Sequence, residues 1–204
     1  MNLIFDFGNS LTKYFFIQDD KVIGRGSFIS NKVDDNLLAI KNKRSIEKLI
    51  YSSVIDDKRD ELSSIFKNSK IISLRDKTIK LPFTNEYKSE TLGDDRVALV
   101  SAGLSLYPNK DLLIIDIGTC ITYDIVAMNK KYLGGSISPG FNLRYSSLSD
   151  RTSNLPKLEL KTPKSLIGDS TEEHIHAGIY YGIIGEISYN IERQKVRFPN
   201  IEII

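Results

Sequence analysis

Two segments of the chain carry nearly the same sequence pattern, and this internal repeat limits the folds that the chain can adopt. Residues 3–24, LIFDFGNSLTKYFFIQDDKVIG, align without a gap with residues 113–134, LIIDIGTCITYDIVAMNKKYLG. The segments are identical at seven of these 22 positions, including an Asp-x-Gly triplet and a Thr four residues beyond the Gly. Each copy is an apolar run, a glycine turn and a second run, which predicts a β-hairpin. The repeat therefore indicates two similar units in tandem.

The turn of each hairpin has the chemistry to bind phosphate and a cation. Its Gly allows backbone N–H groups to approach a ligand closely, and turn amides and hydroxyls can contact phosphate oxygens. The carboxylates of Asp6 and Asp116 accept hydrogen bonds only and can face a hydrated cation. One such turn is more often an ordinary hairpin turn, so the prediction depends on the duplication. Two of these hairpins facing one another would bind a metal-bound polyphosphate between them.

Composition indicates a globular protein and argues against several partners. Of the 204 residues, 41% are hydrophobic and 26% are charged, which is typical of a folded chain. The net charge of +2, with scattered Lys and Arg, does not favour nucleic acid as a partner. No apolar run approaches the ~20 residues that span a membrane. A single Cys excludes an intrachain disulfide framework, and Met1 leads directly into a strand pattern, so we expect a cytoplasmic protein without a signal peptide.

The hydrophobic pattern predicts two α/β units. The first is expected to contain strands at 3–8, 12–17, 21–28 and 48–54, a helix at 57–67 and a strand at 70–74. The second is expected to contain a helix from Asp95, strands at 112–117, 121–127 and 131–137, and a long helix at 171–193. Residues 75–93 have no periodic apolar pattern. We therefore predict domains at 1–90 and 91–204.

The predicted long helix carries isoleucines and glycines on neighbouring faces. Ile recurs every four residues from Ile175 to Ile191, which predicts a buried stripe. Gly178, Gly182 and Gly185 each cost a helix about 1 kcal/mol relative to Ala. We therefore expect another part of the protein to approach the helix backbone closely at these glycines. That part could be the sheet or a second subunit, and we expect the sheet.

Six short motifs together give the chain a specific family resemblance. The chain resembles the type III pantothenate kinases, of the acetate and sugar kinase, chaperone ATPase and actin superfamily, over nearly its whole length. The duplicated hairpin alone would indicate only the superfamily. The motifs are Asp6-Phe7-Gly8-Asn9-Ser10 with Thr12-Lys13, Gly93-Asp94-Asp95-Arg96, Asp116-Ile117-Gly118-Thr119-Cys120-Ile121-Thr122 with Asp124, Gly134-Gly135-Ser136-Ile137-Ser138-Pro139-Gly140, Arg151-Thr152-Ser153-Asn154-Leu155-Pro156, and Gly168-Asp169-Ser170-Thr171.

The resemblance implies a fold, a reaction and partners. The fold is α/β, with two tandem ribonuclease H-like domains that each hold a mixed five-stranded sheet. The reaction is the ATP-dependent phosphorylation of pantothenate to 4′-phosphopantothenate, the first step of coenzyme A biosynthesis. It implies Mg²⁺ with the ATP and a monovalent cation, K⁺ or NH₄⁺. It also implies a homodimer whose pantothenate pocket is built at the subunit interface.

The resemblance also implies residue roles. Asp95 matches the general base that accepts the hydroxyl proton, and the fork of Arg96 suits the pantothenate carboxylate. Asp94 or Asp95 is equally a good helix cap, as is Thr171. The expected ATP contacts are Asp6, Gly8, Asn9, Ser10, Thr12, Lys13, Gly118, Thr119 and Thr122, and the expected metal ligands are Asp116 and Asp6. The expected substrate contacts are Tyr87, Gly93, Asp94, Asp95, Arg96, Arg151 and Thr171, with Arg151 and Thr152 in a loop that closes the pocket.

Two departures from the family pattern keep alternatives open. Ser10 replaces the commoner Thr but retains the hydroxyl. The sequence stops at Ile204, before the Gly-Gly turn and terminal helices that lie beside the adenosine in the family. We therefore expect a second domain without its terminal helices, or a clipped chain. The alternatives are another small-molecule kinase of the superfamily and a catalytically weakened nucleotide-binding regulatory protein.

Overall fold

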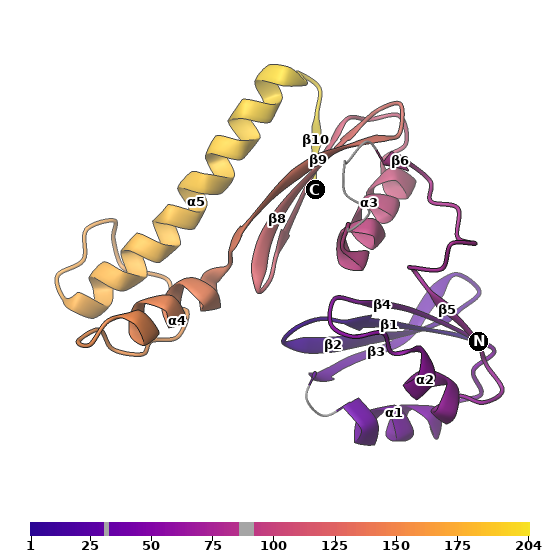
Figure 1. Ribbon diagram of the computed structural model, residues 1–204. Helices are drawn as coiled ribbons and strands as arrows, with labels where there is room; N and C mark the ends of the chain where they lie inside the picture. Colours follow the sequence, from indigo (N-terminus) through magenta and orange to yellow (C-terminus); the bar gives the residue numbers. More distant parts are fainter. Residues whose placement is uncertain (31–32, 86–91) are drawn as a thin grey trace. The chain divides into compact units, whose positions relative to one another are not determined.

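The computed structural model describes residues 1–30, 33–85 and 92–204, and the first of its two sheets has five strands (Figure 1). The strand order is β3-β2-β1-β4-β5. The first three strands form an antiparallel meander, and the last two run parallel to β1. This is the mixed five-stranded sheet that the family resemblance implied. Its strands are β1 (Asn2–Phe7), β2 (Leu11–Gln18), β3 (Lys21–Ile29), β4 (Lys48–Ser53) and β5 (Lys70–Ser73).

One face of this sheet is covered by two helices, α1 (Val33–Lys41) and α2 (Arg59–Ile65) (Figure 1). Leu3, Phe5 and Phe7 of β1 are fully buried against residues of both helices. Because side chains alternate along a strand, the core residues of β1 leave Asp6 on the opposite face. The hydrophobic pattern of the first strand therefore determines where its carboxylate points.

The second sheet also has five strands, but its parallel strands are placed differently. Its order is β10-β7-β8-β9-β6. The central meander repeats that of the first sheet, whereas a two-residue parallel strand lies at each edge. The first sheet instead has both parallel strands on one side of its meander. The strands are β6 (Thr84–Asn85), β7 (Leu112–Ile117), β8 (Cys120–Ala127), β9 (Lys131–Pro139) and β10 (Glu202–Ile203).

Helices α4 (Phe141–Arg151) and α5 (Thr171–Arg197) lie against one another, with the N-terminal part of α5 beside α4 and its C-terminal part nearer the second sheet (Figure 1). Ile175, Ile179 and Ile183 are buried in its core. The last two isoleucines of the predicted stripe are only partly buried, so the buried stripe is shorter than predicted. Among the described residues, no helix is both long and apolar enough to cross a bilayer.

The sheet does not explain the glycines of α5, and the expected packing is wrong. A Cβ built at Gly178 or Gly185 would meet no atom within 4 Å, and one at Gly182 would meet only Nη1 of Arg144, at 3.8 Å. The reason is that the isoleucines, and not the glycines, face the sheet. The glycines are exposed instead.

The exposed glycines belong to a longer stripe on α5. Tyr189 and Val196 follow Gly178 by 11 and 18 residues, which returns to the same face at 3.6 residues per turn. These two side chains are 63% and 75% exposed. We call this surface the open stripe, and it consists of Gly178, Gly182, Gly185, Tyr189 and Val196.

The chain divides into two compact units, and the division falls within α3 (Asp94–Leu106). Unit 1 holds residues 1–82 and the beginning of α3 as far as Ser101. Unit 2 holds β6 and the chain from Ala102 to Ile204. The sequence-based domain boundary at residues 90 and 91 stays a prediction.

Candidate functional site

In the first hairpin, Asp6 and Lys13 lie on the same face. The two residues are directly opposite in the β1–β2 ladder, and such pairs share a face of the sheet. On the neighbouring strand β4, Ser52 donates a hydrogen bond from Oγ to Oδ1 of Asp6, at 3.0 Å. This face therefore presents a carboxylate, a hydroxyl and an exposed ammonium group together.

The turn of the first hairpin is tightly constructed. The N–H of Gly8 donates to the carbonyl of Leu11 at 3.2 Å, and Ser30 Oγ donates to the carbonyl of Gly8 at 2.7 Å. A Cβ on Gly8 would lie 2.8 Å from the Leu11 oxygen, so a side chain does not fit there. Asn9 and Ser10 are exposed in this turn.

Thr12 does not lie with the other predicted nucleotide contacts. It is opposite Phe7 in the ladder and is fully buried, with Oγ1 lying 3.1 Å from Ser30 Oγ. Its side chain therefore points to the core face, away from Asp6 and Lys13. We exclude Thr12 from the site proposed below.

Helix α3 begins in unit 1 with two neighbouring carboxylates in different environments. Asp94 is 4% exposed and accepts hydrogen bonds from the Ser53 N–H at 3.3 Å and from Arg75 Nε at 3.2 Å. Arg75 also donates to the carbonyl of Ser53 at 2.8 Å. Asp94 therefore fixes the start of α3 to the end of β4.

Asp95 is more accessible than its neighbour. It is partly exposed, and its Oδ1 accepts a hydrogen bond from the backbone N–H of Arg96 at 2.8 Å. A Cβ on Gly93 would lie 2.5 Å from that same oxygen, so the glycine leaves room for the carboxylate. The Arg96 side chain is only 8% exposed in unit 1.

The second hairpin differs from the first by one residue of register. Asp116 lies opposite Thr122, whereas the equivalent pair in the first hairpin is Asp6 and Lys13. The N–H of Gly118 donates to the carbonyl of Cys120 at 2.9 Å, which closes a turn that is one residue shorter. A shift of one residue moves a side chain to the other face. Consequently, Thr122 shares a face with Asp116, although its counterpart in the first copy is buried in the core.

Thr122 has the features of a cation ligand. It is 7% exposed, and its Oγ1 has no hydrogen-bond partner in the structure. Asp116, directly opposite, is exposed. A carboxylate beside an unpaired hydroxyl oxygen fits a hard cation, which prefers oxygen ligands. Among the described residues, no three His, Cys, Asp or Glu side chains form a group that could hold a metal.

Gly140 contacts the turn of the second hairpin through its backbone. It follows β9 and donates from its N–H to the carbonyl of Thr119 at 3.0 Å. A Cβ on Gly140 would lie 2.2 Å from the Gly118 oxygen and 2.7 Å from the Thr119 oxygen. The Gly-Gly-x-Ile-x-Pro-Gly motif thus ends at a residue whose backbone is in direct contact with the backbone of the turn, which leaves no room for a side chain.

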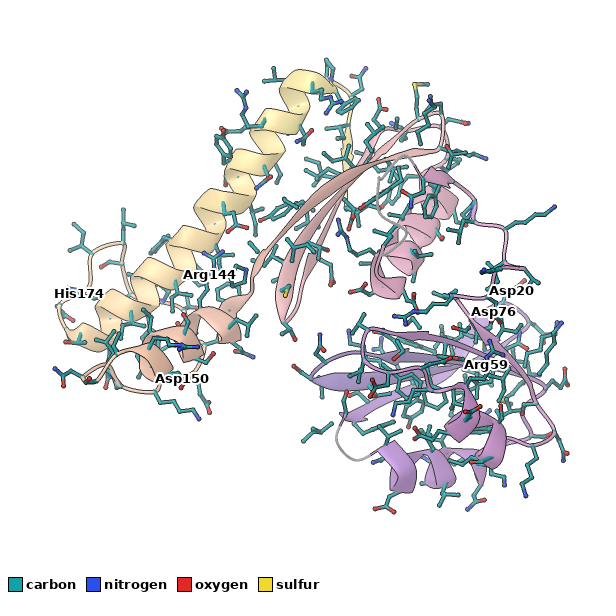
Figure 2. The ribbon with its side chains drawn as sticks, viewed as in Figure 1. Asp20, Arg59, Asp76, Arg144, Asp150 and His174 are labelled. Atoms are coloured by element: carbon teal, nitrogen blue, oxygen red, sulfur yellow. The ribbon has the colours of Figure 1, made fainter. Side chains whose placement is uncertain are left out.

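Glu186 of α5 connects three other elements, and the sequence analysis did not identify it. Tyr123 Oη (2.9 Å) and Ser138 Oγ donate to its Oε1, and Arg144 donates to its Oε2. Figure 2 shows Arg144 on α4, beside α5. Burial alone would raise the pKa of Glu186, but the hydrogen bonds from Ser138, Arg144 and Tyr123 outweigh it and lower that pKa. The sequence signal that could have identified Glu186 is a single acidic residue between the isoleucines of this helix. These four residues are the Glu186 network.

The other predicted substrate contacts are Arg151, Thr171 and Tyr87. Arg151 is exposed and is the last residue of α4, so its expected loop position is wrong, because the helix continues to that residue. Thr171 is exposed and begins α5, but the cap is Ser170, whose Oγ accepts from the Glu173 N–H at 3.3 Å. Tyr87 lies outside the described residues.

Comparison with known proteins decides the family. The profile of the type III pantothenate kinases matches residues 2–193. A type III pantothenate kinase from Christiangramia forsetii is 40% identical over 206 residues, covering 100% of this chain and 84% of that protein. The chain belongs to the type III pantothenate kinase family. Type III pantothenate kinases phosphorylate pantothenate in coenzyme A biosynthesis, and as kinases they use ATP.

Solved structures with a similar fold agree with the expected architecture. One from Campylobacter jejuni, described as a conserved Baf family transcriptional activator, is 25% identical and has a TM-score of 0.54, covering 91% of this chain and 77% of that one. The activator of the 2-hydroxyisocaproyl-CoA dehydratase from Clostridium difficile, solved with bound ADPNP, is 14% identical and has a TM-score of 0.53, covering 100% and 79%. The predicted architecture, α/β with two mixed five-stranded sheets, is confirmed.

Proposed function

We propose that Asp95 is the general base of this kinase and that it removes the proton from the primary hydroxyl of pantothenate as that oxygen attacks the γ-phosphorus of ATP. The observation that carries this assignment is the contrast between two adjacent carboxylates. Asp94 is occupied by Ser53 and Arg75, whereas Asp95 is partly exposed. Phosphoryl transfer requires chiefly positioning and charge neutralisation, with a carboxylate to accept the proton.

The ATP contacts are assigned to both hairpins. In unit 1, Lys13 would neutralise phosphate charge, and the turn from Gly8 to Ser10 would offer backbone and side-chain hydrogen bonds. Asp6 would face the Mg²⁺ that accompanies ATP, mainly through water, because Mg²⁺ retains much of its hydration. In unit 2, Gly118 and Thr119 are the proposed ATP contacts. The support for these roles is the shared face of Asp6 and Lys13 and the glycine turns.

For the substrate, we propose contacts from Gly93, Arg96, Arg151 and Thr171, together with Tyr87. The guanidinium of Arg96 suits a carboxylate because its planar fork can donate two parallel hydrogen bonds. The support for this assignment is its position next to Asp95 at the start of α3.

For the monovalent cation, we propose Asp116 and Thr122 as ligands. Asp116→Asn is expected to remove most of the increase in Tm that KCl produces over NaCl, because the neutral amide attracts a cation less strongly. Thr122→Val, which keeps the shape but loses the hydroxyl, should have the same effect. Differential scanning calorimetry without substrates would measure this. Thr78→Val, an exposed site in unit 1, is the control. An undiminished response to KCl in both test variants would contradict the assignment.

We also propose that two copies associate through the open stripe of α5. Its glycines would let a partner helix approach closely, and its exposed Tyr189 and Val196 would be covered. The double variant Gly178→Ala/Gly185→Ala is expected to weaken association by about tenfold or more, because each methyl group separates the helices. Sedimentation equilibrium would measure this. If no second copy covers the open stripe, the same variant should instead stabilise the helix by about 1 kcal/mol per site and leave association unchanged.

The proposed reaction is tested by a coupled assay of ADP formation with and without pantothenate, and with K⁺ exchanged for Na⁺. ADP formation that requires pantothenate and increases with K⁺ is the expected result. ADP formation independent of pantothenate would favour another kinase of the superfamily. No turnover, together with measurable ATP binding, would favour a nucleotide-binding regulatory protein.

A further inference from the structure

The Glu186 network includes Ser138, which lies two residues before Gly140, and Gly140 contacts the turn that carries Thr119. Glu186 accepts from Ser138, and Arg144 reaches the next residue by donating from Nε to the Pro139 carbonyl at 2.8 Å. Gly140 then donates to the Thr119 carbonyl at 3.0 Å. Three successive residues of the motif therefore each make a contact along this path, in addition to the pairing of Ser138 and Pro139 with β8 and the hydrogen bond from the Arg144 N–H to the Gly140 carbonyl at 3.1 Å. A continuous path of contacts leads from the middle of α5 to the second hairpin turn.

Arg144 is suited to its position in this path. Its guanidinium donates in two directions, to Glu186 and to the Pro139 carbonyl, which a lysine ammonium at the end of a flexible chain does not reproduce. The pair is about three-quarters buried, with 23% and 25% of the two side chains exposed. Its hydrogen bonds are therefore less screened by solvent than those of a surface pair.

We propose that Glu186 is a positioning residue for the nucleotide site, because it fixes the Pro139–Gly140 segment against which the Gly118–Thr119 turn rests. This inference depends on the proposed role of Thr119 as an ATP contact. Glu186 itself touches neither substrate. Its effect is exerted through Ser138 and Arg144, and it should change the binding of ATP but not that of pantothenate.

A purely structural role for Glu186 makes a different prediction. Hydrogen bonds to Tyr123, Ser138 and Arg144 also hold α5 against β8, β9 and α4. If that were their only consequence, a variant would lower Tm and leave both KM values of the folded enzyme unchanged. The ratio of the two KM values therefore separates a positioning role from a structural one.

The test uses Glu186→Gln, which retains an acceptor at nearly the same place but loses the charge. We expect KM for ATP to rise about tenfold, since a hydrogen bond to a charged group is lost. KM for pantothenate should change by less than about twofold. Arg144→Lys should give the same pattern if Glu186→Gln folds poorly. Glu192→Gln, an exposed acid on the same helix, is the matched control and should leave both constants unchanged.

A second measurement does not depend on catalysis. The amide of Gly118 is hydrogen-bonded to Cys120, so its hydrogen exchange reports on the order of the turn. Exchange at Gly118 should accelerate in Glu186→Gln, while exchange at Gly8 in the first hairpin should not. Unchanged Gly118 exchange or an unchanged KM for ATP would overturn the inference. Faster Gly118 exchange in an enzyme with no ATP binding would support the contact path and refute the proposed function.

Discussion

Asp95→Asn is expected to lower kcat by about 10²–10⁴-fold and to leave the free energy of unfolding nearly unchanged. The amide cannot accept the proton that leaves the pantothenate hydroxyl. It does retain an oxygen that can accept the hydrogen bond from the Arg96 N–H. Steady-state kinetics and urea unfolding of the same preparation measure the two quantities.

Asp94→Asn is the matched control for this experiment, because it makes the same chemical change at the preceding residue. It should lower the free energy of unfolding by about 1 kcal/mol, since a carboxylate bonded to Ser53 and Arg75 loses its charge, and Arg75 is half exposed. Its kcat should fall far less. Equal losses of kcat in the two variants, or near-normal turnover of Asp95→Asn, would place the base elsewhere.

Gly140→Ala is expected to destabilise unit 2 by about 1–3 kcal/mol and to raise the Kd for ATP by at least about tenfold. The added Cβ would lie 2.2 Å from one backbone oxygen and 2.7 Å from the next, and backbone cannot rotate away as a flexible side chain can. The Gly118–Thr119 turn must therefore move. Thermal unfolding and isothermal titration with a non-hydrolysable ATP analogue would measure both effects.

Gly118, in the turn that Gly140 contacts, provides the comparison for stability. A Cβ on Gly118 would meet its nearest neighbours at 3.9 Å, which is ordinary contact. Gly118→Ala should therefore cost much less stability than Gly140→Ala. Equal destabilisation by both variants would show that the close backbone contact at Gly140 is not the cause.

Much of the fold was predictable because its signals are local. The two meanders follow from apolar runs separated by short polar turns, and the strand bounds agree with prediction to within about two residues. The Asp19–Asp20 turn has positive φ at both residues, as a two-residue hairpin requires. Two helices were missed. In α1, the spacing of Val33, Leu37 and Ile40 fits a helix, but only nine residues carry it. In α4, only Tyr145 is buried, so the helix has little apolar pattern.

The parts of the site that could not be predicted depend on contacts between distant residues. Glu186 meets Ser138 and Arg144 across 48 and 42 residues, and no local pattern specifies such partners. The buried state of Asp94 likewise depends on Ser53 and Arg75, which precede it by 41 and 19 residues. The sequence placed two carboxylates side by side, and only tertiary contacts distinguish them.

The two hairpin turns differ in length by one residue, and this difference changes which residue lies opposite each aspartate. An alignment without gaps matches Asp6 with Asp116 and Lys13 with Tyr123, yet across the ladder one carboxylate lies opposite a lysine and the other opposite a threonine. The first copy thereby places an ammonium group opposite its carboxylate, which favours an anionic ligand, whereas the second places a neutral hydroxyl there. The one-residue difference in turn length thus places Thr122 opposite Asp116, and not Tyr123, the residue aligned with Lys13.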